Sequence, residues 1–235
     1  MTNPLIARLA EKVLRDGKEA LSPEDAARLA ALPEEETPQI FHFAHRISRE
    51  FGENTAPVLC AIMNAKSGFC GEDCAFCAQS ARHRTNIRTF PLVSPDEMVA
   101  RALQAADQGA GRFSIVTSGV SLGARELERV AHAVRRIRER TDLAVCASLG
   151  MLTEEAAAML RESGVTTYHH NLETARSFFP RICTTHDYEK DLETVRAARK
   201  EGLRTCSGGI LGLGESWAER VELAFTLREI GRAHV

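Results

Sequence analysis

From about residue 57 onward the sequence alternates between short apolar segments and longer amphipathic segments, and this order constrains the fold more than any other feature. The pattern predicts strands near residues 57–62, 112–117, 143–148, 166–170 and 204–210. It predicts helices near residues 95–108, 125–140, 153–163 and 187–201, and a last helix that begins near Ser216. Such alternation is typical of parallel strands that are joined by right-handed helical crossovers.

Such crossovers build either a doubly wound sheet or a (β/α)8 barrel, and the positions of the polar residues favour the barrel. A cysteine-containing segment follows the first strand, and Thr117, Cys146, His169 and Cys206 lie in or just beyond later strands. Active groups at the carboxyl ends of many strands are typical of a barrel. A doubly wound sheet would instead place a glycine-rich turn after its first strand, whereas here the glycines of residues 208–214 follow the fifth. The sequence therefore predicts an α/β fold of the (β/α)8 TIM-barrel type, with about the first five βα units present.

The first part of the chain has a different pattern. Residues 1–40 are expected to form a helical N-terminal extension, in which Ser22, followed by proline and two carboxylates, marks a helix start. Residues 41–229 are expected to form the partial barrel. Residues 230–235 resemble the translation of a common sequencing adapter and are expected to be a non-native tail. Since five strands leave an unpaired edge, we expect a C-terminally truncated fragment that is inactive alone.

Composition limits the partners and the cellular compartment. With a net charge of −2 the chain has no strongly basic character, so no nucleic-acid partner is expected. No apolar run approaches the ~20 residues that span a bilayer, so a soluble, cytoplasmic protein without a membrane partner is expected. The seven cysteines are an odd number and no signal peptide precedes them, which favours reduced thiols over disulfides.

Cys70, Cys74 and Cys77 form a C-x3-C-x2-C motif. Three thiolates at this spacing can hold three irons of a 4Fe-4S cluster and leave the fourth iron open for chemistry. A structural zinc site would need a fourth cysteine or histidine nearby. His83 is the nearest candidate and no second cysteine pair answers the first, so zinc stays as the less favoured alternative.

The cysteine motif resembles the signature of the radical S-adenosylmethionine (radical SAM) enzymes. This resemblance implies that S-adenosylmethionine binds the open iron and is cleaved to a 5′-deoxyadenosyl radical. It also implies that Phe76 packs near the adenine. Together with the motif, residues 168–174 and 206–215 resemble the biotin synthases within this superfamily, over residues 40–229. That family inserts sulfur into dethiobiotin to form biotin and takes the sulfur from an auxiliary iron-sulfur cluster.

The resemblance implies a set of auxiliary-cluster ligands. Cys146 and Cys206 match two of the family's ligands, while the position of a third cysteine is occupied by Ser114. Cys60 and Cys183 are further candidate ligands, as in a variant found among anaerobes, and the cluster is expected to be 2Fe-2S or of different composition. A cysteine at any of these positions could also be a small buried apolar residue.

Further residues are assigned by position within the resemblance. Asn171 and Glu173 match residues that bind the ribose hydroxyls of S-adenosylmethionine, although an asparagine can also stabilise a turn at a strand end. Lys66 and His169 are expected near the substrate, and Arg112 either beside the auxiliary cluster or in an ion pair. No catalytic residue is assigned beyond the cluster ligands. The implied partners are dethiobiotin, a flavodoxin- or ferredoxin-type electron donor and, in a full-length protein, a second copy as a homodimer.

Two alternatives remain at this point. A one-cluster radical SAM enzyme, such as a hydrogenase-cofactor or pyrrolysine-pathway maturase, would share the cysteine motif without needing auxiliary cysteines. A non-catalytic metal-binding protein would hold zinc or a cluster and nothing more. The metal content distinguishes these possibilities, because a sulfur-inserting enzyme holds more iron than one 4Fe-4S cluster.

Overall fold

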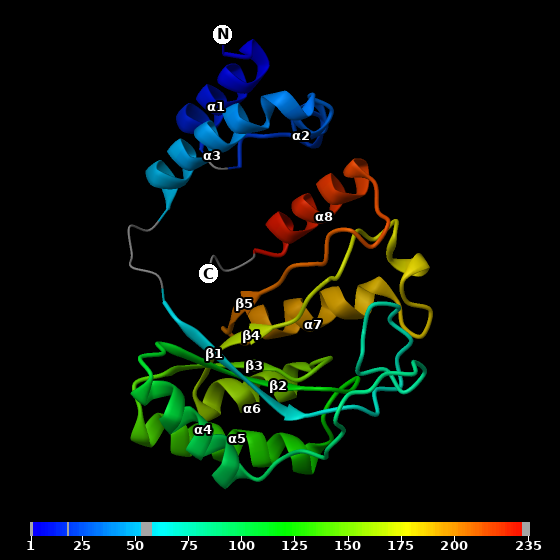
Figure 1. Ribbon diagram of the computed structural model, residues 1–235. Coiled ribbons are helices and arrows are strands. Elements are labelled where there is room, and N and C mark those ends of the chain that lie inside the picture. The colour runs from blue at the N-terminus through cyan, green and yellow to red at the C-terminus, as the bar shows by residue number, and fades with distance from the viewer. Residues whose placement is uncertain (1, 18, 53–57, 232–235) are drawn as a thin grey trace.

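Five parallel strands form one sheet, and their order in the sheet is their order in the chain. The computed structural model describes residues 2–17, 19–52 and 58–231 (Figure 1). The strands are β1 (Cys60–Lys66), β2 (Arg112–Thr117), β3 (Ala144–Ser148), β4 (Val165–His169) and β5 (Arg204–Cys206). A doubly wound sheet reverses its strand order at a switch point, whereas a barrel wall does not. The sequential order confirms the predicted fold class.

Helices follow the strands, and α4 to α7 pack on one another in chain order, whereas α8 packs against the N-terminal helix α2. They are α4 (Pro95–Asp107), α5 (Ala124–Arg140), α6 (Glu154–Ser163), α7 (Tyr188–Lys200) and α8 (Trp217–Glu229). A short 3-10 helix, η2 (Phe179–Arg181), lies between β4 and α7. Side chains of Ser94, Thr153 and Ser216 accept hydrogen bonds from backbone N–H groups in the first turns of α4, α6 and α8. These caps fix the helix starts within a residue or two of the predicted positions.

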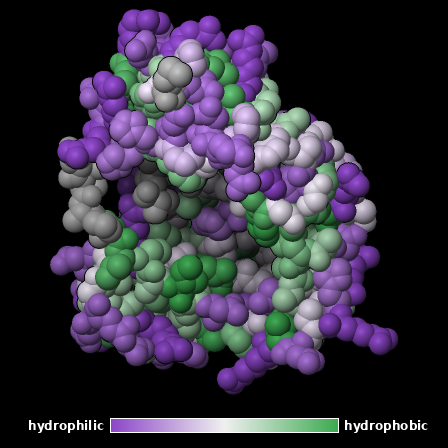
Figure 2. Space-filling view, turned by 45° about the horizontal axis from the view of Figure 1, so that its top comes forward, coloured by the Kyte–Doolittle hydropathy of each residue, from purple (hydrophilic) through white to green (hydrophobic). Residues whose placement is uncertain are grey.

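Each strand divides its side chains between two faces of the sheet, because successive residues point in opposite directions. One face packs against the helices in a continuous apolar core, to which the strands contribute Met63, Ala65, Phe113, Ile115, Val145, Ala147, Val165 and Tyr168. Both β4 residues reach the core because the register between β3 and β4 shifts by one residue between them. The residues between these core positions point to the opposite face, which is the interior of the barrel. Those residues include Cys60, Lys66, Arg112, Ser114, Cys146, Ser148, His169 and Cys206. Figure 2 shows a hollow at the centre of the molecule.

Two strands differ from their predicted ranges. The first strand, expected at 57–62, runs from Cys60 to Lys66, and residue 57 lies outside the described residues. The second half of β1 alternates between buried apolar residues and the polar Asn64 and Lys66. These polar residues made the strand seem to end earlier than it does. The fifth strand, expected at 204–210, ends at Cys206, and only a single bridge between Glu173 and Gly209 continues the pairing.

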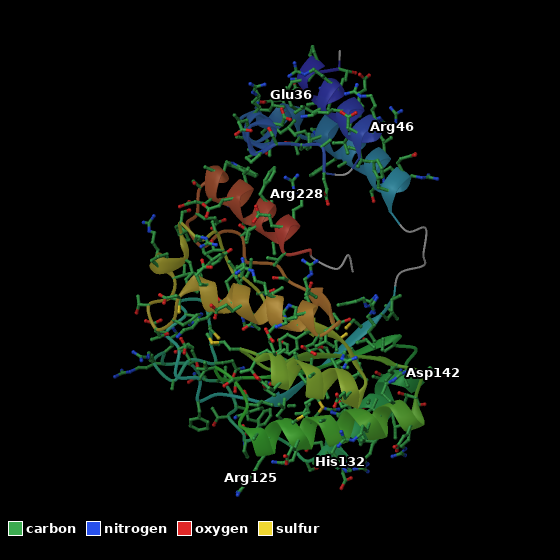
Figure 3. All side chains as sticks on the ribbon, turned by 180° about the vertical axis from the view of Figure 1, so that it is seen from behind. Glu36, Arg46, Arg125, His132, Asp142 and Arg228 are labelled. Carbon is green, nitrogen blue, oxygen red and sulfur yellow. The ribbon has the colours of Figure 1, made fainter. Side chains whose placement is uncertain are left out.

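The N-terminal segment is helical, as expected, but it extends further. It contains α1 (Pro4–Asp16), α2 (Pro23–Ala30), the 3-10 turn η1 (Glu34–Glu36) and α3 (Thr37–Phe51). The expected boundary at residue 40 lies inside α3, which packs against α1. Arg228 of α8 points toward this segment and donates a 2.8 Å hydrogen bond to the carbonyl of Leu21 (Figure 3). Of the expected tail, residues 232–235 lie outside the described residues.

Every helix in the described ranges is too short or too polar to cross a membrane.

Gly150 joins the loop after β3 to the loop after β2. Its φ is +85°, in the left-handed region, and an added Cβ would lie 2.3 Å from the carbonyl oxygen of Val120. Tyr168, fully buried on β4, donates a 2.6 Å hydrogen bond to the Gly150 carbonyl. The glycine therefore serves both the backbone conformation and the close approach of two loops.

We predict that Gly150→Ala lowers the free energy of unfolding by about 3 kcal/mol or more, because it combines left-handed strain with a backbone clash. Gly109→Ala is the matched control: its φ is +84° but the space around it is open. That variant should lose only about 1 kcal/mol. Urea unfolding followed by circular dichroism measures both, and equal losses would show that the approach to Val120 contributes nothing.

Candidate functional site

The cysteine motif lies in a loop that begins directly after β1. Gly68 and Phe69 both have positive φ values, +81° and +58°, so the chain turns sharply at the strand end. Backbone hydrogen bonds then close the loop, from Cys70 to the carbonyl of Gln79 at 3.1 Å and from Ala81 back to the carbonyl of Cys70 at 2.8 Å. The Gln79 side chain accepts from Ser67 Oγ at 3.1 Å. This closure holds the motif over the carboxyl ends of the strands.

The three thiols of the motif face one cavity of about 200 Å³. Burial raises the pKa of Cys74, and the nearby Cys183, Cys77 and Cys70 raise it further through charge repulsion. Thiols that repel one another in their ionised forms need a positive partner, which iron ions supply. The donor set therefore fits three corners of a 4Fe-4S cluster. His83, the candidate fourth zinc ligand, instead places its Nε2 atom 3.0 Å from the carbonyl oxygen of Cys74.

Across the cavity, the ends of β3 and β4 supply polar side chains. Asn171 and Glu173 both line it, and the Asn171 amide donates to Glu173 at 3.4 Å. Burial raises the pKa of Glu173. The backbone of Glu173 has a φ of +62°, and its carbonyl accepts a 2.8 Å hydrogen bond from Ile210. A non-glycine residue in the left-handed region is strained, and such strain is concentrated at functional sites.

The two residues expected near the substrate each have a partner. Lys66, the last residue of β1, forms a 2.9 Å ion pair with Glu126 in the first turn of α5. His169 also lines the cavity and lies with Nδ1 3.1 Å from Ser148 Oγ, while burial, then the charge of His170, lowers its pKa. Uncharged imidazole can both donate and accept a hydrogen bond.

A second group of cysteines lies on the interior face of the sheet, where Cys146 is buried, Cys206 is partly buried and Cys60 is exposed. Cys60, Cys146 and Cys206 come from β1, β3 and β5. Burial raises the pKa of Cys146, and the charges of Cys60 and Cys206 raise it further. Cys60 behaves similarly: burial raises its pKa, Arg112 opposes this increase, and Cys206 adds to it. Charge effects weaken with distance, so these directions agree with the strand register, in which Cys60 lies opposite Arg112.

Ser114 belongs to the same region. It is buried on β2, opposite Ile62 of β1 and opposite Cys146 of β3 in the strand register. Arg112, one layer away, lies opposite Cys60. The residue that replaces the expected third cysteine therefore lies between the strands that carry Cys60 and Cys146.

Cys183 lies elsewhere, beside the motif loop. Its Sγ atom is 3.8 Å from Sγ of Cys74, and the residue is buried. The segment that follows η2 packs back onto the motif loop, where Ala75 donates a 2.8 Å hydrogen bond to the carbonyl of Ile182. This position does not agree with the expectation that Cys183 helps to complete the auxiliary cluster.

A polar group that the sequence did not predict lies beside the motif loop and is formed by Glu72, His170, His186 and Asp191. His186 bonds to Glu72 at 2.6 Å, and Asp191 accepts from His170 at 2.8 Å. The Asp191 carboxylate, aided by Glu72, raises the pKa of His186 to about 9 against the effect of burial. The sequence signals were a carboxylate inside the cysteine motif and a histidine just after β4, but His186 and Asp191 come from a loop and a helix more than 100 residues beyond Glu72.

Comparisons with known proteins agree with this geometry. The model of the radical SAM superfamily matches residues 65–227. A biotin synthase of Syntrophus aciditrophicus (strain SB) is 54% identical over 94% of this chain and 68% of its own length. A biotin synthase of Geobacter metallireducens is 51% identical over 97% of this chain and 69% of its own length.

Solved structures support the fold alone, because their sequence identities are low. A methylornithine synthase matches 95% of this chain and 65% of its own, with a TM-score of 0.80 and 17% identity. The FeFe-hydrogenase maturase HydG from Carboxydothermus hydrogenoformans matches 95% of this chain and 53% of its own, with a TM-score of 0.78 and 20% identity. The family model covers most of the chain, and two biotin synthases are 54% and 51% identical to it, so the chain belongs to the biotin synthase family of the radical SAM superfamily.

Proposed function

We propose that this protein forms biotin from dethiobiotin by radical insertion of one sulfur atom. The observation that carries the proposal is the presence of two cysteine groups in one barrel, the motif loop at its mouth and Cys60, Cys146 and Cys206 inside it. A sulfur-inserting enzyme needs one cluster to start the reaction and a second to give up sulfur. A one-cluster maturase or a non-catalytic metal-binding protein has no use for the inner group.

The residues around the cavity bind and orient the cofactor. When bound, the 4Fe-4S cluster supplies the electron that cleaves S-adenosylmethionine, which gives the radical needed to break unactivated C–H bonds. Cys70, Cys74 and Cys77 hold three of its irons. Phe76, which lines the cavity, packs against the adenine of the bound cofactor. Glu173 accepts hydrogen bonds from the ribose hydroxyls, and Asn171 holds its carboxylate in position.

Lys66 and His169 orient the substrate. The Lys66 ammonium, paired with Glu126 in this structure, exchanges that partner for the carboxylate of dethiobiotin. His169, held by Ser148, presents its second ring nitrogen as a neutral hydrogen-bonding group. Both side chains are partly buried, so their bonds to the substrate form with little competition from water.

The inner cysteines hold the auxiliary cluster, whether 2Fe-2S or a variant. We infer that Cys60 supplies the thiolate that Ser114 cannot, because β1 is the neighbour of β2 in the sheet. Arg112, close to Cys60, offers a positive charge to the cluster. Thiolates are stronger ligands for iron than a serine hydroxyl, which is ionised only at high pH.

The remaining assignments rest on family membership. An electron donor of the flavodoxin or ferredoxin type reduces the first cluster. The protein acts as a homodimer in the cytoplasm.

We predict that Cys60→Ser loses iron from the auxiliary cluster and lowers biotin formation by more than about 100-fold, because a cluster ligand is lost. Cleavage of S-adenosylmethionine should continue, since the motif loop is intact. Cys183→Ser is the matched control and should keep the auxiliary iron. The test is the iron and sulfide content, together with single-turnover biotin assays, of the anaerobically reconstituted full-length protein. Unchanged auxiliary iron in Cys60→Ser would remove Cys60 from the ligand set.

We further predict that Glu173→Gln raises KM for S-adenosylmethionine about tenfold, the effect of losing a hydrogen bond to a charged group. Glu155→Gln on α6, whose side chain is exposed, should leave KM unchanged. The assay is the production of 5′-deoxyadenosine. If both variants match the wild type, Glu173 does not contact the cofactor.

A further inference from the structure

Four metal-binding side chains meet behind the motif loop. The Sγ atoms of Cys74 and Cys183 are 3.8 Å apart, and Nδ1 of His186 lies 3.3 Å from Sγ of Cys183. A carboxylate oxygen of Glu72 lies 2.6 Å from the same nitrogen. We propose that Glu72, Cys74, Cys183 and His186 form a site for one divalent transition-metal ion, such as Zn²⁺ or Fe²⁺, in protein that carries no cluster.

The distances suit a single tetrahedral ion. Zinc binds thiolate sulfur at about 2.3 Å and imidazole nitrogen at about 2.0 Å. Two thiolates on one tetrahedral ion are therefore about 3.8 Å apart, and a thiolate and an imidazole nitrogen about 3.6 Å. The two sulfur atoms already have this separation. To admit the ion, the contacts of His186 with Glu72 and with Cys183 must lengthen by less than about 1 Å, and the Cys74 thiol, which lies outside the group of donor atoms within 4.8 Å of one another, must turn toward the ion.

A second set of hydrogen bonds orients these ligands. The far ring nitrogen of His186, Nε2, lies 3.4 Å from the carboxylate of Asp191, which is buried and also accepts from His170. Carboxylates in this position fix the ring of a metal-binding histidine. Glu72 in turn accepts a hydrogen bond from Thr185.

Backbone contacts bring the two segments together before any ion binds. Ala75 donates to the carbonyl of Ile182 at 2.8 Å, and Thr184 donates to the carboxylate of Asp73 at 2.9 Å. The donor atoms of Glu72, Cys183 and His186 all lie within 4.8 Å of one another. Three of the four ligands are thus preorganised, with the Cys74 thiol beside Cys183, and this lowers the entropic cost of binding.

An ion pair between His186 and Glu72 explains part of this arrangement but not the cysteines. A free buried cysteine is usually a small apolar residue in apolar surroundings. Cys183 instead contacts a second thiol, an imidazole and the Thr185 hydroxyl. Two sulfur ligands with one nitrogen and one oxygen suit zinc or ferrous iron better than magnesium or calcium.

The site shares Cys74 with the motif loop. While Cys74 binds this ion it cannot hold a corner of the 4Fe-4S cluster, so the ion and the cluster exclude each other. The mutual exclusion of the ion and the cluster rests on the proposed function, whereas the metal site itself does not.

Cobalt(II) is the probe for the experiment, because thiolate-to-cobalt absorption reports sulfur ligands directly. The Cys70→Ser/Cys77→Ser double variant lacks the other two motif thiols and keeps all four proposed ligands. We expect it to bind one Co²⁺ with thiolate absorption, and added Cys183→Ser or His186→Gln to weaken this binding about tenfold or more. Cys146→Ser in the same background is the matched control and should leave this component intact. Circular dichroism confirms that each variant is folded.

Two results would overturn the proposal. One is the absence of thiolate-bound Co²⁺ in the folded double variant, and the other is binding that persists unchanged after loss of both Cys183 and His186. Competition is tested separately, by adding Zn²⁺ during cluster reconstitution of the wild type and of Cys183→Ser. The variant should need about tenfold more Zn²⁺ to block loading. Equal sensitivity would disprove the competition, whereas failure to form biotin would concern the proposed function alone.

Discussion

The two-residue period of the parallel strands is the constraint on which the other features depend. Because successive side chains point to opposite faces, each strand contributes apolar residues to the helix-covered core and different residues to the barrel interior. On β3, Val145 and Ala147 pack in the core while Cys146 points inward. A one-residue shift in register would move Cys146 into the core and Val145 into the interior. The same packing that stabilises the sheet therefore selects which cysteines can meet inside it.

The loops after the strands add the second level of organisation. At the end of β1 the chain turns through two residues with positive φ, and the motif loop then closes on itself and on the segment around Ile182. These contacts are mostly backbone hydrogen bonds, which tolerate many sequences but fix where the side chains lie. The motif thiols, Asn171 and Glu173 consequently line one cavity although they come from different βα units. The strands of the barrel fix the positions of the loops, and the loops carry most of the side chains that line the cavity.

Much of this arrangement could be predicted from the sequence, because its signals are local. Helices with polar caps such as Ser94 and Ser216 begin where the pattern indicates, and three cysteines within eight residues must lie close together. The second half of β1 was missed because Asn64 and Lys66, which face the interior, resemble loop residues. The contact between Cys74 and Cys183 spans 109 residues and depends on how a loop packs, so spacing could not reveal it. Contacts between distant loops are set by tertiary structure rather than by local pattern.

The central claim is that one barrel holds two separate iron-sulfur clusters. Mössbauer spectra of anaerobically reconstituted protein in which Cys70, Cys74 and Cys77 are all replaced by alanine test it most directly. The account predicts that one cluster disappears and that a second, bound by the inner cysteines, keeps its iron. If all iron is lost with the three motif cysteines, the inner group holds no cluster and the sulfur-insertion function is contradicted.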